Sequence, residues 1–162
     1  LYMQKTLVII KPDGVQRRLI GKIINRFEEK GLEIIGLKMT VISEELAKEH
    51  YSVHVGRDYY EKLVKFMTSG PVVMMVLSGK KAIAVTRKLM GSTFGHEAEP
   101  GTIRGDLAIS KRFNLIHGSD SEESAEKEIS LFFGNGDLIQ NDQSGLKWIY
   151  DLSGDPTDEN SF

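Results

Sequence analysis

The chain has 162 residues, 40% of them apolar, which is enough for one domain with its own core, and its charged residues leave a net charge of −2. No apolar run approaches the ~20 residues that a membrane-spanning helix needs, and the absence of cysteine excludes disulfides, catalytic thiolates and cysteine zinc sites. The slightly acidic balance argues against nucleic acid as the main partner, and the lack of cysteine fits a cytoplasmic location.

The first predicted element is a buried strand from Thr6 to Ile10, which Pro12-Asp13-Gly14 ends with a turn. No small-residue cleavage site follows this short apolar stretch, so we expect no signal peptide. Apolar residues then recur at helical spacing from Ile20 to Phe27, and Gly31 is a typical helix stop. Alternation from Leu32 to Val41 predicts a second strand.

A helix is predicted to begin at Ser43 and run to about His54, and another covers Tyr59 to Met67. The near-continuous apolar run from Pro71 to Leu77 is typical of a central strand with both faces covered. Lys81 to Met90 is predicted to be helical, so helices are available to cover that strand.

The pattern has no period from Gly91 to Phe113, and a loop of this length in a compact domain is usually functional. Leu115-Ile116 predicts a short strand, and a helix is expected from Ser121 through Phe133. We interpret residues 1–152 as a single domain and residues 153–162 as an acidic C-terminal tail.

Helices alternate with about four strands, which predicts an α/β sandwich around one sheet. Because the sheet is small, we expect a ferredoxin-like βαββαβ core with a four-stranded antiparallel sheet rather than a doubly wound fold.

The glycine motifs that cradle phosphates are absent. Gly79-Lys80 lacks the upstream glycine of a P-loop, and Gly134-Asn135-Gly136 does not continue into a complete dinucleotide fingerprint. If a nucleotide binds, side chains must therefore hold its phosphates.

Four histidines are candidates for chemistry. His50 and His54 are four apart and can face one metal, but we interpret them as exposed residues of a helix surface, and His96 as a solvated loop residue. His117 differs because it ends an apolar strand just before a helix start, where a neutral imidazole can act as a nucleophile. A structural histidine that caps the strand is an equally supported interpretation at this point.

A nucleophilic histidine needs one ring nitrogen held by a partner. Glu128 lies about two turns into the following helix and can fold back over the strand end, and Ser119 can support the same pair. Phosphoryl transfer also needs positive charge around the phosphate oxygens. Candidate cations are Lys11, Arg57, Arg87 and Arg104, with Thr93 and Asn114 as neutral donors and Tyr59 or Tyr60 as an aromatic face. Each of these cations taken singly is more often a solvated surface charge.

Several segments taken together resemble the nucleoside diphosphate kinase family, over residues 5 to 150. The segments are Lys11-Pro12-Asp13-Gly14-Val15-Gln16-Arg17, Lys48-Glu49-His50-Tyr51, Ser69-Gly70-Pro71-Val72-Val73, Pro100-Gly101-Thr102-Ile103-Arg104-Gly105-Asp106 and Asn114-Leu115-Ile116-His117-Gly118-Ser119-Asp120-Ser121. The last of these, followed by Glu123 to Glu128, is the most specific.

The resemblance implies ping-pong transfer from a nucleoside triphosphate to a nucleoside diphosphate through a phosphohistidine on His117 Nδ1. It implies that Mg²⁺ is bound mainly through the nucleotide phosphates, with no protein metal site, and that the protein forms a homo-oligomer, either a hexamer or a tetramer of dimers. It also assigns roles to the following residues: Lys11, Arg87, Thr93 and Arg104 on the phosphates, Asn114 and Lys11 on the sugar, Tyr59 and Leu63 at the base, Arg57 at an active-site position, and Tyr51, Ser119 and Glu128 as support for the histidine.

The sequence departs from the family pattern at two places near this site. Phe94-Gly95 replaces the usual asparagine-proline pair, and Lys111 stands where an aliphatic residue usually faces the base. The segment from Gly134 to Gln143 also differs. Two rival interpretations are a non-enzymatic regulatory member of the family and a ferredoxin-like RNA-binding domain, but the aliphatic strands and the net charge disfavour the second.

Overall fold

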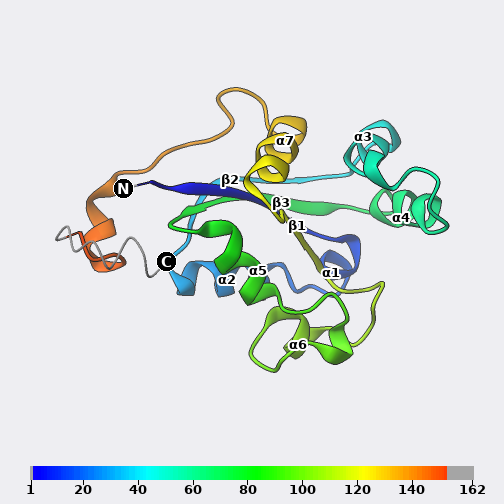
Figure 1. Cartoon of the computed structure of the whole chain (residues 1–162), viewed down its shortest axis with the longest axis horizontal. Helices are drawn as coiled ribbons and strands as arrows, with labels where there is room; N and C mark the ends of the chain where they lie inside the picture. The colour runs from blue at the N-terminus through cyan, green and yellow to red at the C-terminus, as the bar shows by residue number, and fades with distance from the viewer. Residues whose placement is uncertain (1, 153–162) are drawn as a thin grey trace.

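The computed structural model describes residues 2–152, and its centre is a four-stranded sheet with the order β2-β3-β1-β4 (Figure 1). Each neighbouring pair of strands is antiparallel. The strands are β1 (Gln4–Ile10), β2 (Glu33–Thr40), β3 (Val72–Gly79) and β4 (Ile116–Gly118). This confirms the predicted ferredoxin-like core with an antiparallel sheet.

The two central strands, β1 and β3, have unbroken apolar sequences because both faces of the sheet are buried. Successive side chains of a strand point to opposite faces of the sheet, and in β1 the residues Leu7 and Ile9 enter one core while Val8 and Ile10 enter the other. All four of these side chains are fully buried. Helices therefore have to cover both faces of the sheet.

The helices divide between those faces (Figure 1). One layer contains α2 (Ile20–Lys30), α5 (Ala82–Met90) and the short α6 (Ile103–Leu107), and the other contains α3 (Glu44–His50), α4 (Tyr60–Met67) and α7 (Glu122–Phe132). Local signals set several ends: Gly31 closes α2 with φ +100°, and the hydroxyls of Ser43 and Ser121 cap α3 and α7.

Three local predictions were wrong. The chain after Lys11 forms the short helix α1 (Pro12–Gln16) instead of a simple turn, because proline is well suited to the first turn of a helix. Helix α3 ends at His50, and a separate 3₁₀ turn, η1, covers Ser52–His54. The segment from 91 to 113 is not a plain loop, since it contains η2 (Gly95–Glu97) and α6.

The last described segment packs back onto the sheet. The 3₁₀ turn η3 (Gln143–Trp148) leads to Tyr150, whose hydroxyl oxygen accepts a 3.0 Å hydrogen bond from the backbone N–H of Lys80. The predicted acidic tail at 153–162 lies outside the described residues. Within residues 2–152, every helix is too short or too polar to cross a membrane.

Candidate active site

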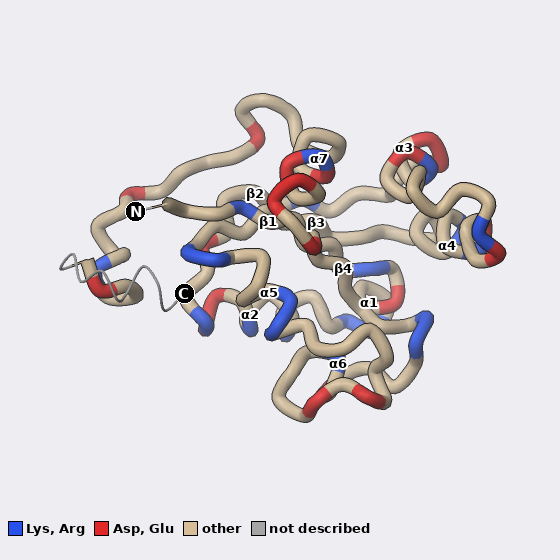
Figure 2. Tube along the Cα trace, viewed as in Figure 1, with Lys and Arg blue, Asp and Glu red and all other residues tan. Residues whose placement is uncertain are grey.

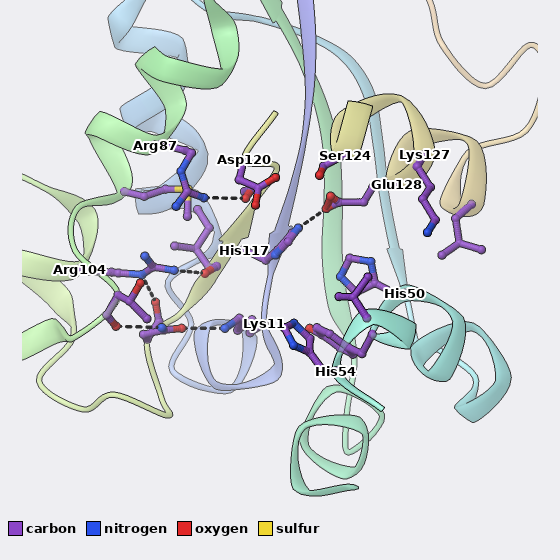
Figure 3. A pocket seen from close by; sticks show the side chains of 18 residues that line it. Lys11, His50, His54, Arg87, Arg104, His117, Asp120, Ser124, Lys127 and Glu128 are labelled. Atoms are coloured by element: carbon purple, nitrogen blue, oxygen red, sulfur yellow. Dashed lines mark hydrogen bonds and ion pairs between the residues drawn. The ribbon is translucent and has the colours of Figure 1, made fainter. Parts of the chain in front are cut away.

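A cavity of about 350 Å³ opens beside β4, between α5 and the 91–115 segment on one side and α3, η1 and α7 on the other (Figure 3). This volume lies within the range of about 300–1,000 Å³ typical of small-molecule sites. The cavity brings together eight of the residues predicted from sequence: Lys11, Tyr51, Arg87, Thr93, Arg104, Asn114, His117 and Glu128.

Strand register decides where His117 points. His117 pairs with Ile9 of β1, and directly paired residues of antiparallel strands share one face of the sheet. Ile9 belongs to the core beneath α7, so His117 faces α7 as well. There its Nε2 is hydrogen-bonded to Oε1 of Glu128, as the sequence predicted (Figure 3).

The His117–Glu128 pair is shielded but not closed off. The side chain of Glu128 is 11% exposed and that of His117 is 23% exposed. A buried carboxylate on Nε2 fixes the proton on that nitrogen, and Nδ1 has no hydrogen bond to any described residue. The ring therefore presents its Nδ1 lone pair to the cavity.

Charge is divided across the cavity. Figure 2 shows acidic residues concentrated on α7 and basic residues at α5 and around the start of α1. Lys11, Arg87 and Arg104 face the cavity from the basic side. Such a surface attracts an anionic ligand toward His117.

Lys11 belongs to a short polar chain. Its Nζ donates a 2.8 Å hydrogen bond to Oδ1 of Asn114, and Nδ2 of Asn114 donates a 3.0 Å bond to the backbone oxygen of Thr93. Burial, with a further contribution from Arg104, lowers the pKa of the Lys11 ammonium to about 8. Asn114 therefore positions the cation and also fixes the loop that carries Thr93.

Arg104 is buried and holds the loop in place. Its guanidinium donates to three backbone oxygens: Nε to Asn114 at 3.2 Å, Nη1 to Gly91 at 3.1 Å and Nη2 to Ile116 at 2.6 Å. Burial, and secondarily Arg87, lowers the pKa of Arg104 to about 10, so it remains cationic at neutral pH. Two of its five N–H groups are left over for a ligand.

A strained residue precedes the histidine strand. Leu115 has φ +72°, a left-handed conformation that is costly for a leucine. The carboxylate of Asp13 accepts a 3.1 Å hydrogen bond from the N–H of Leu115, and the N–H of Lys11 donates to its carbonyl at 2.8 Å. Lys11 and the first turn of α1 thus hold the approach to His117 in one conformation.

His50 corrects the sequence interpretation. It is not an exposed helix residue: both ring nitrogens are buried, and its ring lies edge-on to that of His117 with centroids 5.0 Å apart. Burial lowers the pKa of His50 to about 3, so the ring is neutral. Because α3 ends at His50, His50 and His54 do not lie on one helix; Nδ1 of His54 lies 2.9 Å from the hydroxyl of Tyr59. His96 is exposed, as expected.

Ser119 does not contact the pair that it was expected to support. It is fully buried, and its hydroxyl accepts from the N–H of Leu7 at 3.2 Å, which joins β4 to β1. Tyr51 is buried against the cavity wall, and burial followed by the charge of Glu128 raises the pKa of its phenol.

The residues expected at the base lie outside this cavity. Arg57 and Tyr59 are exposed near η1, and Leu63 packs against the core under α4. The two departures from the family pattern contact each other, since Nζ of Lys111 lies 4.8 Å from the ring centroid of Phe94.

Sequence reasoning missed several lining residues. They include Val53, His54, Asp120, Ser124 and Lys127. Asp120 and Ser124 could have been found, because they flank Ser121 at the helix start beside the histidine strand. Burial was the missing signal for His50, and it depends on the docking of α3 against α7.

Comparison with known proteins agrees with this geometry. Residues 4–138 match the family model of nucleoside diphosphate kinase. The nucleoside diphosphate kinase of Bacillus licheniformis is 54% identical over 148 residues, which are 91% of this chain and 100% of the relative. That of Sulfurisphaera tokodaii is 54% identical over 137 residues, 85% of this chain and 93% of the relative.

A solved structure shares the fold closely. The halophilic nucleoside diphosphate kinase from Halobacterium salinarum, solved in complex with CDP, superposes with a TM-score of 0.90 at 47% identity and covers 93% of this chain and 100% of its own. The resemblance drawn from the sequence motifs is thereby confirmed. The chain belongs to the nucleoside diphosphate kinase family.

Proposed function

We propose that His117 carries the phosphoryl group between two nucleotides in this enzyme. The observation that supports this role is the pairing of its Nε2 with a buried carboxylate, which leaves Nδ1 facing three cations. A nucleoside triphosphate would phosphorylate His117, and after the diphosphate leaves, a second nucleoside diphosphate would take the group. This is a ping-pong transfer with a covalent intermediate.

Each half-reaction balances on the same atoms. The Nδ1 lone pair attacks the terminal phosphorus, and the bond from phosphorus to its bridging oxygen breaks, with the electron pair leaving on the diphosphate. The ring gains positive charge, and its Nε2–H remains donated to Glu128. The carboxylate therefore stabilises the charge that develops during transfer. The second half-reaction is the reverse with a different diphosphate.

The cations are suited to the phosphate chain. Lys11 directly follows the end of β1, Arg104 and Arg87 line the same cavity, and we assign the transferred phosphoryl group to Lys11. Thr93 adds a hydroxyl at the loop edge. Asn114 is already bonded to Lys11, so we propose that it reaches a sugar hydroxyl only together with that lysine.

The base would lie toward η1 and α4. Tyr59 is 48% exposed, so we propose that its ring stacks on the base, and Leu63 lies one turn further along; Arg57 is at the same rim. Stacking uses the π-face that all bases share, so we expect broad tolerance among bases.

The donor set suits magnesium that arrives with the nucleotide. Two carboxylates line the described part of the cavity, and Glu128 is already paired with His117, which leaves Asp120 as the one available to help hold the ion. Mg²⁺ is commonly held by one or two carboxylates together with substrate phosphates. When bound, the ion would neutralise charge on the phosphate oxygens.

We also propose a homo-oligomer. The outer strand β2 exposes Leu37 and Met39, and Val41 follows just beyond it; these side chains are 54%, 59% and 61% exposed. An apolar edge strand favours pairing with another chain. A hexamer or a tetramer of dimers would cover it, and the cysteine-free composition suits a cytoplasmic location.

The histidine assignment is tested by labelling. ATP labelled in its terminal phosphate should leave an acid-labile label on the protein, and adding an unlabelled diphosphate should remove it as labelled triphosphate. We expect His117→Ala to abolish both steps and His96→Ala, at an exposed loop position, to keep them. Label uptake and transfer by His117→Ala would refute the assignment.

A further inference from the structure

His50 has polar atoms that the transfer reaction does not use. Both of its ring nitrogens are buried and have no hydrogen-bond partner among the described residues. Buried polar atoms are nearly always paired, so an orphaned imidazole calls for a physical explanation. The rings of Tyr51, His117 and Phe132 surround it edge-on, with centroids 4.4, 5.0 and 5.3 Å away.

The orphaned imidazole stands next to two further metal-ligand types. One donor atom from each of His50, His117 and Glu128 lies within 4.8 Å of the other two. Among residues 2–152, this is the one group of three such side chains. The three come from α3, β4 and α7, so only the folded chain assembles them.

The spacing is close to that of a metal shell. Ligand atoms of a tetrahedral zinc ion lie about 3.4 Å apart, since each is about 2.1 Å from the metal. Closing from 4.8 Å or less requires a movement of at most ~1.4 Å. Rotation of the unbonded His50 ring can supply much of this movement.

The donor types select the metal. Two imidazoles and one carboxylate form the set that holds catalytic zinc, with a fourth position left open. Magnesium prefers oxygen ligands, whereas borderline transition metals accept imidazole.

We propose that His50, His117 and Glu128 bind a borderline divalent transition metal, with Zn²⁺ as the representative ion, and that the bound ion blocks phosphorylation of His117. The site is separate from the magnesium that accompanies the nucleotide. The block rests on the proposed role of His117, whereas the binding itself does not.

The block follows from where the ring proton lies. To attack phosphorus, Nδ1 must carry a lone pair, so the proton is on Nε2 and is donated to Glu128. A metal at Nε2 is bound through a lone pair on Nε2 itself, so the proton of the neutral ring moves from Nε2 to Nδ1. The metal also removes Glu128 as the partner of His117. A ring in this state has no nucleophilic Nδ1.

Metal binding is measured first, without any activity assay. One equivalent of Co²⁺ should give the intense visible absorption of a tetrahedral site, and Zn²⁺ should displace it. We expect His50→Gln to weaken Co²⁺ binding roughly 10-fold or more, while His54→Gln keeps the wild-type affinity. His54 is the matched control because it lines the same cavity but is not one of the three donors. No visible band, unchanged affinity in His50→Gln, or equal loss in His54→Gln would overturn the site.

The wild-type protein provides a test that needs no variant. X-ray absorption at the zinc edge should show two imidazole ligands and one or more oxygen ligands. A shell with one imidazole or none would overturn the assignment, even if His50→Gln failed to fold.

The block is measured on the phosphohistidine. At buffered free Zn²⁺, we expect wild-type labelling by ATP to fall and to recover after the metal is chelated. Relative to its own rate without zinc, His50→Gln should tolerate roughly 10-fold more free Zn²⁺. Zinc binding with undiminished labelling would overturn the block, while label retained in His117→Ala would overturn only the transfer role of that histidine.

Discussion

Replacing Glu128 by glutamine isolates the charge on the carboxylate that holds His117. The two side chains have nearly the same shape, and a glutamine oxygen can still accept the Nε2–H bond, so the tautomer is kept. What is lost is the negative charge opposite the ring as the ring becomes cationic. Because Glu128 contacts His117 rather than the phosphates, nucleotide affinity should stay close to wild type.

The size of the effect follows from the burial of the pair. Glu128 is 9% exposed, so little solvent screens its interaction with the ring. A hydrogen bond to a charged group contributes about 1.5–3 kcal/mol and one between neutral groups about 0.5–1.5 kcal/mol, so the retained but neutral bond is weaker by about 1–1.5 kcal/mol. Because about 1.4 kcal/mol changes a rate tenfold, we expect phosphohistidine formation to slow by roughly 5- to 13-fold.

The rate is measured by rapid-quench labelling of His117 under single-turnover conditions. Nucleotide affinity is measured separately by calorimetry, comparing His117→Ala with the double variant that also carries Glu128→Gln. Glu126→Gln is the matched control, since Glu126 is an exposed glutamate on the same helix. Equal losses in rate and affinity, or a rate unchanged by Glu128→Gln, would refute the reasoning.

Further predictions concern a cation, a hydroxyl and a glycine. Because the pKa of Lys11 is lowered to about 8, its charge is lost as pH rises through that value, and kcat/KM should fall there. In Lys11→Arg the fall should move to higher pH, which a pH profile of kcat/KM would show. Ser119→Ala removes the hydroxyl bonded to Leu7 and should lower the free energy of unfolding by about 1–3 kcal/mol in urea titrations; unchanged stability with lost transfer would instead indicate a direct catalytic role. Gly105→Ala should lower the Tm, because the new Cβ would meet the carbonyl oxygen of Glu99 at 1.9 Å, and an unchanged Tm would contradict this close approach.

Local interactions made much of the fold predictable. The runs that became β1 and β3 are apolar at every position because helices cover both faces of the sheet. Gly31, Ser43 and Ser121 mark helix ends through bonds made within a few residues. The prediction of a plain loop at residues 91–113 was wrong because a local pattern does not reveal what holds α6. This helix is held by the long-range bonds of Arg104 and by the tight fit of Gly105.

The sequence by itself determined most of the strands and helices, the family, and His117 with Glu128 as a candidate pair. All of these depend on residue spacing and short motifs. Only the tertiary structure decided that His50 is buried against His117, that Ser119 joins two strands, and that Arg104, which was expected on the phosphates, also holds its loop through bonds to backbone oxygens. These partners lie on different elements. Their contacts depend on strand register and helix docking, which no local pattern encodes.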